Sequence, residues 1–364
     1  MRLERLERLD ANPLLRPEDV APTRDDLVVL CALNPAAVRF GDETLLLVRV
    51  GERPVDAPGY VCYLYYDAER GVEAVGRIRC DDPDLGVVDT RKYTYRGKTL
   101  LTSMSHLRIA RSGDGRNFTF DPTPAIFPTT AYEAYGCEDA RITRLEDSTG
   151  SPRRARYVIT YTAVSDRGVT VAMATTEDFA TFEKHGVIFP PYQKDVVIFP
   201  ERIPCESGGE GLYACRHRPY KSEFNDACIW TAYSPDLLSW GRHAMTLAPT
   251  PGTWQADRVG AGGVPIRTDA GWLEIYHASD GRRYALGAML SEPERPERVV
   301  SRSSRPVLLP EADYEREGVF ADTVFANGLV ADDDGTLTVY YGAGDRVCAA
   351  AVTTIDAMVA AARQ

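Results

Sequence analysis

The clearest architectural signal in this chain is the segment Ala174-Thr-Thr-Glu-Asp-Phe-Ala-Thr-Phe182, whose pattern recurs twice more. Ala110-Arg-Ser-Gly-Asp-Gly-Arg-Asn-Phe118 and Ala232-Tyr-Ser-Pro-Asp-Leu-Leu-Ser-Trp240 place a small residue, a hydroxyl, an Asp and an aromatic at the same offsets. Weaker echoes follow at Gly287–Glu292 and Ala350–Asp356. Self-similarity at a regular spacing is the signature of a repeat architecture.

A second repeat runs out of phase with the first and consists of short β-rich runs. Each run ends in a polar or aromatic residue: Leu45–Arg49, Tyr157–Tyr161, Leu212–His217, Trp272–His277 and Leu337–Tyr341. Runs rich in Val, Ile, Tyr and Thr between Gly, Pro, Asn and Asp clusters are typical of strands. Five copies of such a unit predict an all-β chain folded as a five-bladed β-propeller of four-stranded blades. The alternative is a β-sandwich with accidental similarity between its turns.

The repeat also predicts the domain organisation. We expect residues 1–364 to form a single propeller domain, with short terminal helices at Met1–Asp10 and Ile355–Arg363. The spacing is interrupted between Val50 and Ser105, so Gly51–Lys98 is expected to be an insertion or an enlarged first blade.

Composition excludes several classes of function. The net charge of -11 argues against a general nucleic-acid binder, which needs a basic face. The amino terminus lacks an apolar stretch of signal-peptide length, and no segment has 18 uninterrupted apolar residues, so we expect a cytoplasmic protein without a membrane partner. The cysteines are scattered without a C-x-x-C pair, which argues against a disulfide framework or a zinc site; they are Cys31, Cys62, Cys80, Cys137, Cys205, Cys215, Cys228 and Cys348.

The segment Tyr135-Gly-Cys-Glu-Asp-Ala-Arg141 contains the best candidate for an acid catalyst. A carboxyl group near apolar and aromatic side chains has its neutral form favoured, as a general acid requires, and Asp139 is expected in that role. The alternative is that Glu138, Asp139 and Arg141 form a turn salt bridge.

Basic residues recur at predicted strand ends in this acidic chain. In a propeller such ends converge at one mouth, which is expected to bring Arg49, Arg218, His277 and Asp345 together. A set of cations there would suit a dianion: Lys194, His217, Arg218, Arg258 and His277. Each taken singly is more often a surface ion pair or a satisfied histidine.

Aromatic residues near these clusters are candidates for stacking on sugar faces, although most buried aromatics belong to a core: Tyr132, Tyr135, Tyr220, Trp254 and Trp272. The chain has no Gly-rich phosphate loop, nucleophile elbow or H-E-x-x-H motif. Hydride transfer, nucleotide hydrolysis and zinc proteolysis are therefore disfavoured.

Segments across nearly the whole chain resemble glycoside hydrolase family 130, the β-mannoside phosphorylases and related β-mannosidases. The resemblance is carried, in order, by Asn34–Ala37, Leu47–Arg49, Ser105–Gly115, Tyr132–Arg141, Lys194–Glu201, His217–Pro219, Arg258–Gly262, Gly271–His277, Pro310–Glu315 and Tyr340–Asp345. It implies a five-bladed propeller and an inverting reaction with Asp139 as the acid, acting directly or through a sugar hydroxyl.

The resemblance also implies site residues. The positions matching a phosphate site are Lys194, Arg218, Arg258, His277 and Tyr284. Positions expected to contact the sugar substrate are Asn34, Arg49, Ser105, Glu138, Arg141, His217 and Asp345. Lys194 and Arg258 stand where some phosphorylases carry Arg and Lys, an exchange that keeps charge but alters hydrogen-bond geometry.

Three activities fit the resemblance. The favoured one is phosphorolysis, in which inorganic phosphate attacks the anomeric carbon of a β-mannooligosaccharide or mannosyl disaccharide and gives α-mannose 1-phosphate. A hydrolase would instead need a second carboxylate to activate water, for which Glu201 and Glu274 are the candidates. The third is a non-catalytic glycan-binding propeller. No metal or cofactor beyond the phosphate co-substrate is expected, and assembly into a homo-oligomer is left open.

Overall fold

A computed structural model describes residues 6–89, 91–145, 156–204 and 209–364, so Cys205 lies outside the described residues. The chain is nearly all β, with two short α-helices, α1 (Asp313–Arg316) and α2 (Ile355–Ala362), and 3₁₀ turns at Pro17–Asp19 and Ala131–Glu133. None of the described helices has the length and apolar character needed to cross a bilayer.

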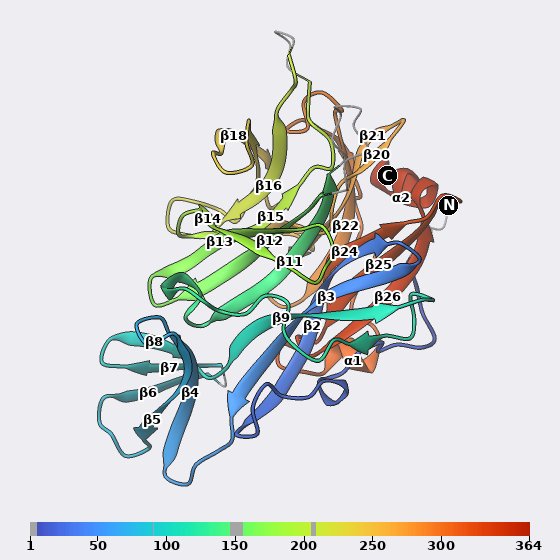
Figure 1. Ribbon diagram of the computed structural model, residues 1–364. Helices are drawn as coiled ribbons and strands as arrows, with labels where there is room; N and C mark the ends of the chain where they lie inside the picture. The colour runs from blue at the N-terminus through green and yellow to red at the C-terminus, as the bar shows by residue number, and fades with distance from the viewer. Residues whose placement is uncertain (1–5, 90, 146–155, 205–208) are drawn as a thin grey trace.

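Most strands form antiparallel groups that follow one another along the chain (Figure 1). The first group holds β2 (Leu27–Phe40), β3 (Glu43–Pro54), β9 (Met104–Ser112) and β10 (Thr119–Phe120). The second holds β11 (Gly136–Leu145), β12 (Arg156–Ser165), β13 (Gly168–Thr176) and β14 (Glu183–Phe189). A parallel pair between Gly136 and Ser105 joins these two groups.

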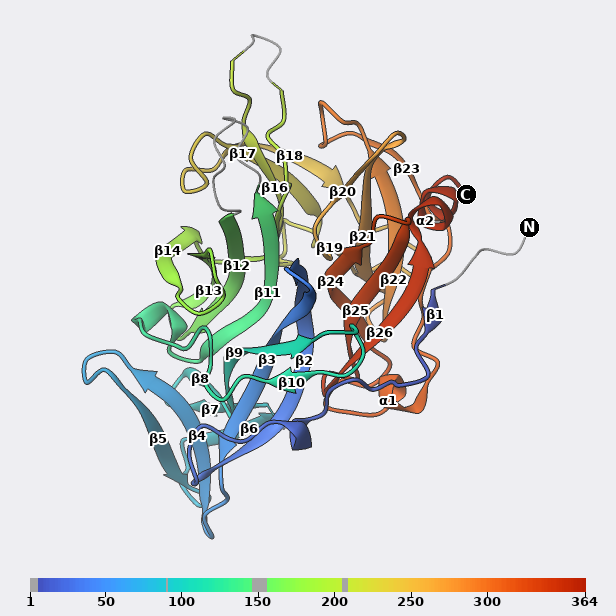
Figure 2. The same cartoon turned by 45° about the vertical axis from the view of Figure 1, so that its right-hand side comes forward.

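Three further groups complete the main body. The third holds β15 (Gln193–Ile198), β16 (Tyr213–Pro219), β17 (Ile229–Ser234) and β18 (Gly241–Leu247). The fourth holds β19 (Arg258–Ala261), β20 (Ile266–Thr268), β21 (Gly271–Ser279), β22 (Tyr284–Ser291) and β23 (Val299–Arg302). The fifth holds β24 (Val324–Ala331), β25 (Thr336–Ala343), β26 (Val347–Thr354) and the amino-terminal β1 (Glu7–Arg8). Figure 2 shows the groups in chain order around the molecule, with β24 beside β2.

The repeated nonapeptides form the same turn after the third strand of their groups. In the second group, Thr176 Oγ1 accepts from Phe179 N, and Asp178 Oδ1 accepts from Ala180 N and Thr181 N. Ser112 with Asp114, and Ser234 with Asp236, make the equivalent bonds. These backbone donors hold the pKa of Asp178 at about 2. The hydroxyl and Asp of the repeat are therefore explained by local turn chemistry.

The second repeat corresponds to the second strand of each group, namely β3, β12, β16, β21 and β25. These strands are buried on both faces and supply much of the core. Leu47, Ile159 and Ile275 are completely or almost completely buried in it. Their continuous apolar character follows from that burial.

The two ends of the chain differ from each other. The predicted carboxy-terminal helix is confirmed as α2, where Thr354 Oγ1 accepts from Ala357 N as an N-cap. The predicted amino-terminal helix is wrong for the described residues, because Glu7 and Arg8 pair with Val352 and Ala351 of β26. The edge of β26 offers backbone hydrogen bonds that an isolated amphipathic segment lacks, and they override helix periodicity.

Residues 60–101 form two small sheets that we call the arm. One sheet pairs β4 (Tyr60–Asp67) with β5 (Val72–Arg79), and the other holds β6 (Leu85–Asp89), β7 (Lys92–Tyr95) and β8 (Lys98–Leu101). The arm lies beside the first and second groups (Figure 1). Ile78 and Leu100 pack with Tyr135 and Val164, and Tyr66 N donates to Ala134 O, so the arm is fastened to the main body.

Candidate active site

A cavity of about 1440 Å³ opens between the arm and the main body. This exceeds the range of about 300–1000 Å³ that is usual for small-ligand pockets, and it leaves room for more than one sugar ring. Its lining includes most of the residues singled out from the sequence: Asn34, Arg49, Glu138, Asp139, Lys194, Arg218, Arg258, Tyr284 and Asp345.

Three polar residues are aimed by irregularities in the first strands of their groups. Asn34, Asp139 and Asp195 have φ values of 48°, 49° and 54°. Each lies at a register shift of its strand: Leu33/Ala36, Glu138/Arg141 and Lys194/Val197. Asn and Asp tolerate this left-handed region better than other side chains, and a bulge redirects the residue that it contains. Local backbone geometry thus explains why these positions are Asn or Asp.

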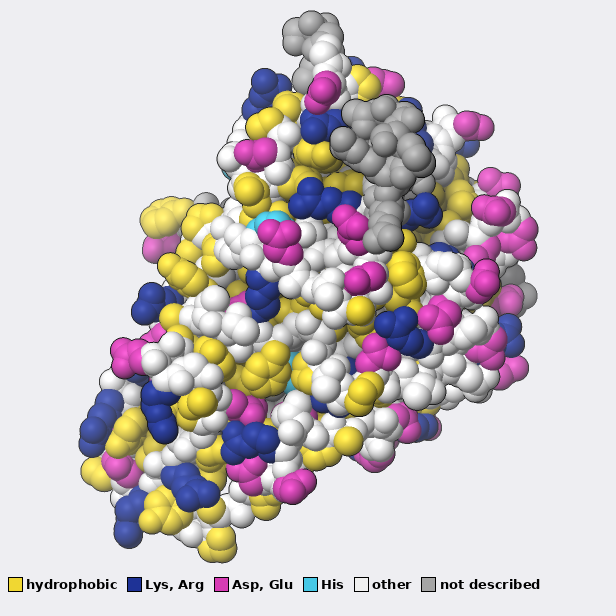
Figure 3. Space-filling model, viewed as in Figure 1, with side chains coloured by type: hydrophobic (Ala, Val, Ile, Leu, Met, Phe, Trp, Pro, Cys, Tyr) yellow, Lys and Arg dark blue, Asp and Glu magenta, His cyan; other side chains and the backbone are white. Residues whose placement is uncertain are grey.

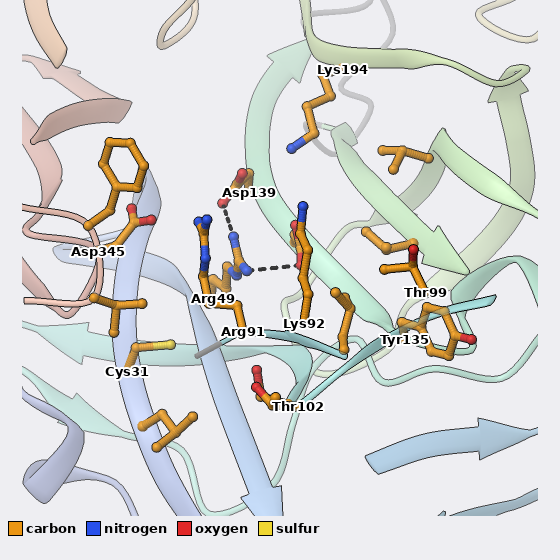
Figure 4. Close-up of a pocket in the computed structure, with 18 of the residues that line it drawn as sticks. Cys31, Arg49, Arg91, Lys92, Thr99, Thr102, Tyr135, Asp139, Lys194 and Asp345 are labelled. Atoms are coloured by element: carbon orange, nitrogen blue, oxygen red, sulfur yellow. Dashed lines mark hydrogen bonds and ion pairs between the residues drawn. The ribbon is translucent and has the colours of Figure 1, made fainter. Parts of the chain in front are cut away.

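Asp139 is held by neutral and charged donors (Figure 4). Asn34 Nδ2 donates to Asp139 Oδ1 at 2.8 Å, and Arg49 Nη1 donates to the same oxygen at 3.2 Å. Arg49 also donates to Glu138 Oε1 at 2.9 Å and to Ser105 Oγ at 3.0 Å. Ser105 and Glu138 therefore orient Arg49, and Arg49 orients the acid.

The charge state of Asp139 differs from the expectation based on sequence. Burial raises its pKa, but the charges of Arg49 and Lys194 and the Asn34 bond outweigh burial, so the pKa lies below its ordinary value. The expectation that the surroundings favour the neutral form is wrong. Lys194, which the sequence assigned to a phosphate site, and Arg49, which it assigned to the sugar, both act on Asp139, and the charges and hydrogen bonds around it together outweigh burial.

A second buried carboxyl group, that of Asp345, also lines the cavity and is close enough to Asp139 to feel its charge (Figure 4). Burial and the charge of Asp139 raise its pKa, against the influence of Arg49. The negative charge of Asp139 disfavours a second negative charge close to it, so Asp345 holds a proton more readily than an isolated carboxyl group, although Arg49 opposes this.

The predicted phosphate-site cations form a second cluster. Lys194 and Arg218 are cross-strand partners on β15 and β16, and Lys194 Nζ lies 5.7 Å from the Tyr220 ring centroid. The guanidinium of Arg258 lies 5.9 Å from the Tyr284 ring centroid. Burial lowers the pKa of Lys194, but Tyr220, Glu138 and Asp139 outweigh it, so this amine is held in its charged form. The cluster can bind a dianion beside Asp139.

Asp195 is the functional candidate that the sequence analysis missed. It is 2% exposed; Arg218 Nε donates to its Oδ2 at 2.6 Å, Arg141 Nη2 donates to its Oδ1 at 3.2 Å, and His277 Nε2 lies 3.3 Å from Oδ2. These partners hold its pKa well below the ordinary value despite burial. The sequence shows Asp195 directly after Lys194. Asp195 lies at the register shift of β15, as Asp139 lies at the register shift of β11.

Some predicted residues lie behind the cavity wall. Arg141 is 1% exposed and donates to the carbonyl oxygens of Asp139, Ala261 and Gly262, so it ties β11 to β19. His277 is fully buried against Phe325, with ring centroids 4.1 Å apart, and burial lowers its pKa although Asp195 opposes this. Both support residues that reach the cavity.

Packing around His277 is tight because a glycine faces it. A Cβ added at Gly260 would lie 2.2 Å from His277 Nε2 and 2.6 Å from Asp195 Oδ2. The glycine in the Arg258–Gly262 segment thus allows β19 to approach the Asp195 cluster.

His217 and Ser105 also lie outside the cavity lining. His217 Nδ1 is 2.9 Å from Gln193 Oε1, its Nε2 is 3.0 Å from His243 Nδ1, and its ring stacks on Phe189. Burial and the charge of His243 lower its pKa to about 3, so it does not act as a cation at neutral pH. Ser105 reaches the site only through Arg49.

The two carboxylates suggested for a hydrolytic base are not part of the cavity lining. Glu274 is 3% exposed and forms a bidentate ion pair with Arg216, with an Arg216 Nε to Glu274 Oε2 distance of 2.8 Å. Glu201 is exposed at the surface. Both suggestions are therefore wrong as regards position.

The aromatic candidates include residues that line the cavity and residues that do not. Tyr135 and Tyr220 line the cavity, and burial raises the pKa of Tyr135 to about 12. Trp272 packs on Phe199 in the core, Trp254 is half-buried and stacks on Tyr276, and Tyr132 is outside the lining. Across the described ranges, no cluster of three His, Cys, Asp or Glu side chains could hold a metal ion.

Comparison with known proteins adds independent information. A family model described as beta-1,4-mannooligosaccharide phosphorylase matches residues 81–364. Beta-1,2-mannobiose phosphorylase of Listeria innocua is 41% identical over 93% of both chains. The 1,2-beta-oligomannan phosphorylase of a Thermoanaerobacter species is 37% identical over 68% of this chain and 78% of the relative.

Solved structures agree with these matches. The Listeria innocua enzyme in complex with beta-1,2-mannobiose superposes with a TM-score of 0.90 and 38% identity, covering 98% of this chain and 99% of that one. A structure of a hydrolase that targets beta-1,2 mannosidic linkages in Candida mannan shares the fold at a TM-score of 0.70 and 21% identity, covering 98% and 95%. The family model and the relative at 41% identity each extend over most of the chain, and the chain belongs to glycoside hydrolase family 130.

Proposed function

We propose that this protein is an inverting β-mannoside phosphorylase, in which inorganic phosphate is the nucleophile and Asp139 is the general acid. The observation that carries the proposal is the cluster of Lys194, Arg218 and Arg258 beside Asp139 in one cavity. The carboxylate within that cluster, Asp195, is already bound by Arg218 and Arg141. Cations with no free carboxylate suit phosphate better than a water that must be deprotonated.

Asp345 and Glu138, which lie next to Asp139 and Arg49, do not supply a hydrolytic base either. Asp345 shares Arg49 with Asp139, whereas an inverting base must act from the opposite face of the sugar. Glu138 is ion-paired with Arg49 at 2.9 Å. Phosphate therefore provides the nucleophile that these side chains do not.

The reaction balances without any further reagent. A phosphate oxygen forms a bond to the anomeric carbon while the bond from that carbon to the glycosidic oxygen breaks. Asp139 delivers a proton to the departing oxygen, directly or through a sugar hydroxyl. The products are α-mannose 1-phosphate and a shortened acceptor, and the configuration at the anomeric carbon is inverted.

β-1,2-Mannobiose is the substrate to test first, because relatives at 41% and 37% identity act on β-1,2-linked mannosides. The assay compares its cleavage with and without phosphate, and proton NMR identifies the anomer formed. We expect phosphate-dependent formation of α-mannose 1-phosphate. Phosphate-independent release of mannose would indicate a hydrolase, and binding without cleavage would indicate a glycan-binding protein.

Phosphate binding is expected to move the pH dependence of turnover. Lys194 is one of the cations that lower the pKa of Asp139, and a phosphate dianion bound beside it would offset its charge. Since the acid must be protonated, activity falls as pH rises through its pKa. At saturating phosphate this fall should therefore occur about one pH unit or more higher than at trace phosphate.

The measurement is kcat/KM for mannobiose across pH at two phosphate levels, with the dianion concentration held constant at each level. If kcat/KM falls at the same alkaline pH at both phosphate levels, the result contradicts this coupling between phosphate and Asp139.

The finer architecture is part of the same proposal. The five groups of strands are taken as blades of a five-bladed propeller, and the whole chain as one catalytic domain in which the arm is an insertion or part of an enlarged first blade. Support comes from the four-stranded groups and from the contacts of β24 with β2 that join the last group to the first. Cytoplasmic location, and the absence of a cofactor other than phosphate, remain predictions.

A further inference from the structure

The arm supplies cavity residues that the proposed mechanism does not use. Arg91, Lys92, Tyr93 and Thr99 line the cavity from β7, β8 and the residue before β7. In Figure 4, Arg91 and Lys92 come from the wall opposite Lys194, and their charged ends point into the cavity toward Asp139 and Lys194. In Figure 3 several Lys and Arg side chains gather over the arm at the lower left.

The arm reaches across the cavity to the opposite wall. The guanidinium of Arg91 lies 5.6 Å from the ring centroid of Phe320, which precedes β24. Its charge also acts on Asp345. The arm therefore closes one side of the same cavity that holds Asp139.

Lys92 differs from the neighbouring cations of the arm. Arg91 pairs with Asp89 at 3.3 Å, and Lys98 pairs with Asp166 at 3.3 Å. Within the part of the chain that the structure describes, no ion pair of this kind involves Lys92. Its ammonium group has donors available for a ligand.

Because the proposed reaction inverts the configuration at the anomeric carbon, it determines which part of the substrate can contact the arm. The nucleophile and the leaving group lie on opposite faces of the anomeric carbon. If the cations on β15, β16 and β19 bind phosphate, the leaving sugar lies on the other side of Asp139, and the arm is one of the walls of the cavity that it can contact. This step rests on the proposed function.

We propose that the arm face made by Arg91, Lys92 and Thr99 is the binding site for the leaving hexose of the β-mannoside. Lys92 is its donor to ring hydroxyls. Lys92 is a specificity-determining residue that takes no part in proton transfer.

The test uses Lys92→Met in the synthetic direction, with α-mannose 1-phosphate as donor and mannose as acceptor. Loss of a hydrogen bond from a charged group is expected to raise the KM for mannose about tenfold or more. The KM values for α-mannose 1-phosphate and, in phosphorolysis, for phosphate should stay within about twofold of wild type. Arg79→Met is the matched control, because Arg79 is an exposed arm cation that pairs with Asp81 outside the cavity.

Titration calorimetry separates this inference from the proposed function. If the wild type shows no phosphate-dependent cleavage, the proposed function fails, and binding of β-1,2-mannobiose then tests the subsite alone. Weaker mannobiose binding by Lys92→Met than by Arg79→Met supports the subsite. Unchanged acceptor KM and unchanged mannobiose binding overturn it, and so does a selective rise in the KM for phosphate, which would assign Lys92 to the anion.

Discussion

Asp139→Asn is expected to lower kcat/KM for mannobiose phosphorolysis about a thousandfold or more, because the variant cannot donate a proton to the leaving oxygen. Asn retains the size of the side chain and can still accept from Asn34 and Arg49, so the fold should persist. The measurement is steady-state phosphorolysis together with thermal unfolding of both proteins. An active Asp139→Asn enzyme would show that the acid lies elsewhere.

The choice of leaving group separates an acid from a binding residue. A β-mannosyl donor whose leaving group departs without protonation, such as the fluoride, should be used by Asp139→Asn far better than mannobiose, relative to wild type. Glu138→Gln is the matched comparison, because Glu138 shares Arg49 but has no proposed proton to give. Its loss of activity should be similar for both donors. Equal losses on both donors for Asp139→Asn would assign it to binding.

Much of the strand pattern could be predicted because it depends on local chemistry. The turns after β9, β13 and β17 each need a hydroxyl and an Asp two residues apart, and these residues stand in the sequence at regular spacing. The second strands are recognisable by their continuous apolar runs. The amino-terminal strand could not be read in this way, since β1 exists only because β26 offers an edge far away in the sequence.

The identity of a site residue could be predicted where the backbone geometry favours that residue type. Properties that depend on partners far away in the sequence, such as charge state, could not. Asn34 and Asp139 were identified, and they lie at bulges with left-handed φ values. The charge state of Asp139 depends on Arg49 and Lys194, which lie 90 and 55 residues away in the sequence. No local sequence pattern therefore predicts whether the pKa of Asp139 is raised or lowered. Glu274 was suggested as a base, but Arg216 engages it in the interior.

Asp195 explains how the cations of the proposed phosphate site can be packed together. Like charges in a buried cluster repel, and each loses hydration. Asp195 offsets this by accepting from Arg218 and Arg141 and lying beside His277, and the three partners come from β16, β11 and β21. It is a positioning residue, since its oxygens are engaged by protein groups.

Asp195→Asn should therefore have a large effect on both stability and phosphate binding. Removing one charge from a buried ion pair costs about 3–5 kcal/mol, because the partner guanidinium groups stay buried without compensation. Urea unfolding at neutral pH measures this free energy. Asp121→Asn is the control, because the Arg111–Asp121 pair, at 3.0 Å, is partly exposed and should contribute about 1 kcal/mol or less.

The pH dependence of the difference in unfolding free energy between wild type and Asp195→Asn shows whether the charge of Asp195 causes that difference. The pKa of folded Asp195 lies well below its ordinary value, so the stability that its charge contributes is present above the pKa of the unfolded chain, about 3.9. It is lost as pH falls from there through the folded pKa. The difference between wild type and Asp195→Asn should accordingly be constant near neutrality and shrink below about pH 4.

Kinetic measurements on Asp195→Asn then show whether Asp195 positions the phosphate-site cations or only stabilises the fold. With Arg218 no longer held by a carboxylate, the KM for phosphate should rise about tenfold or more, while the affinity for mannobiose measured without phosphate changes little. A variant that lost both affinities equally would show that Asp195 only maintains the fold. A selective loss of phosphate affinity would place the anion beside Arg218.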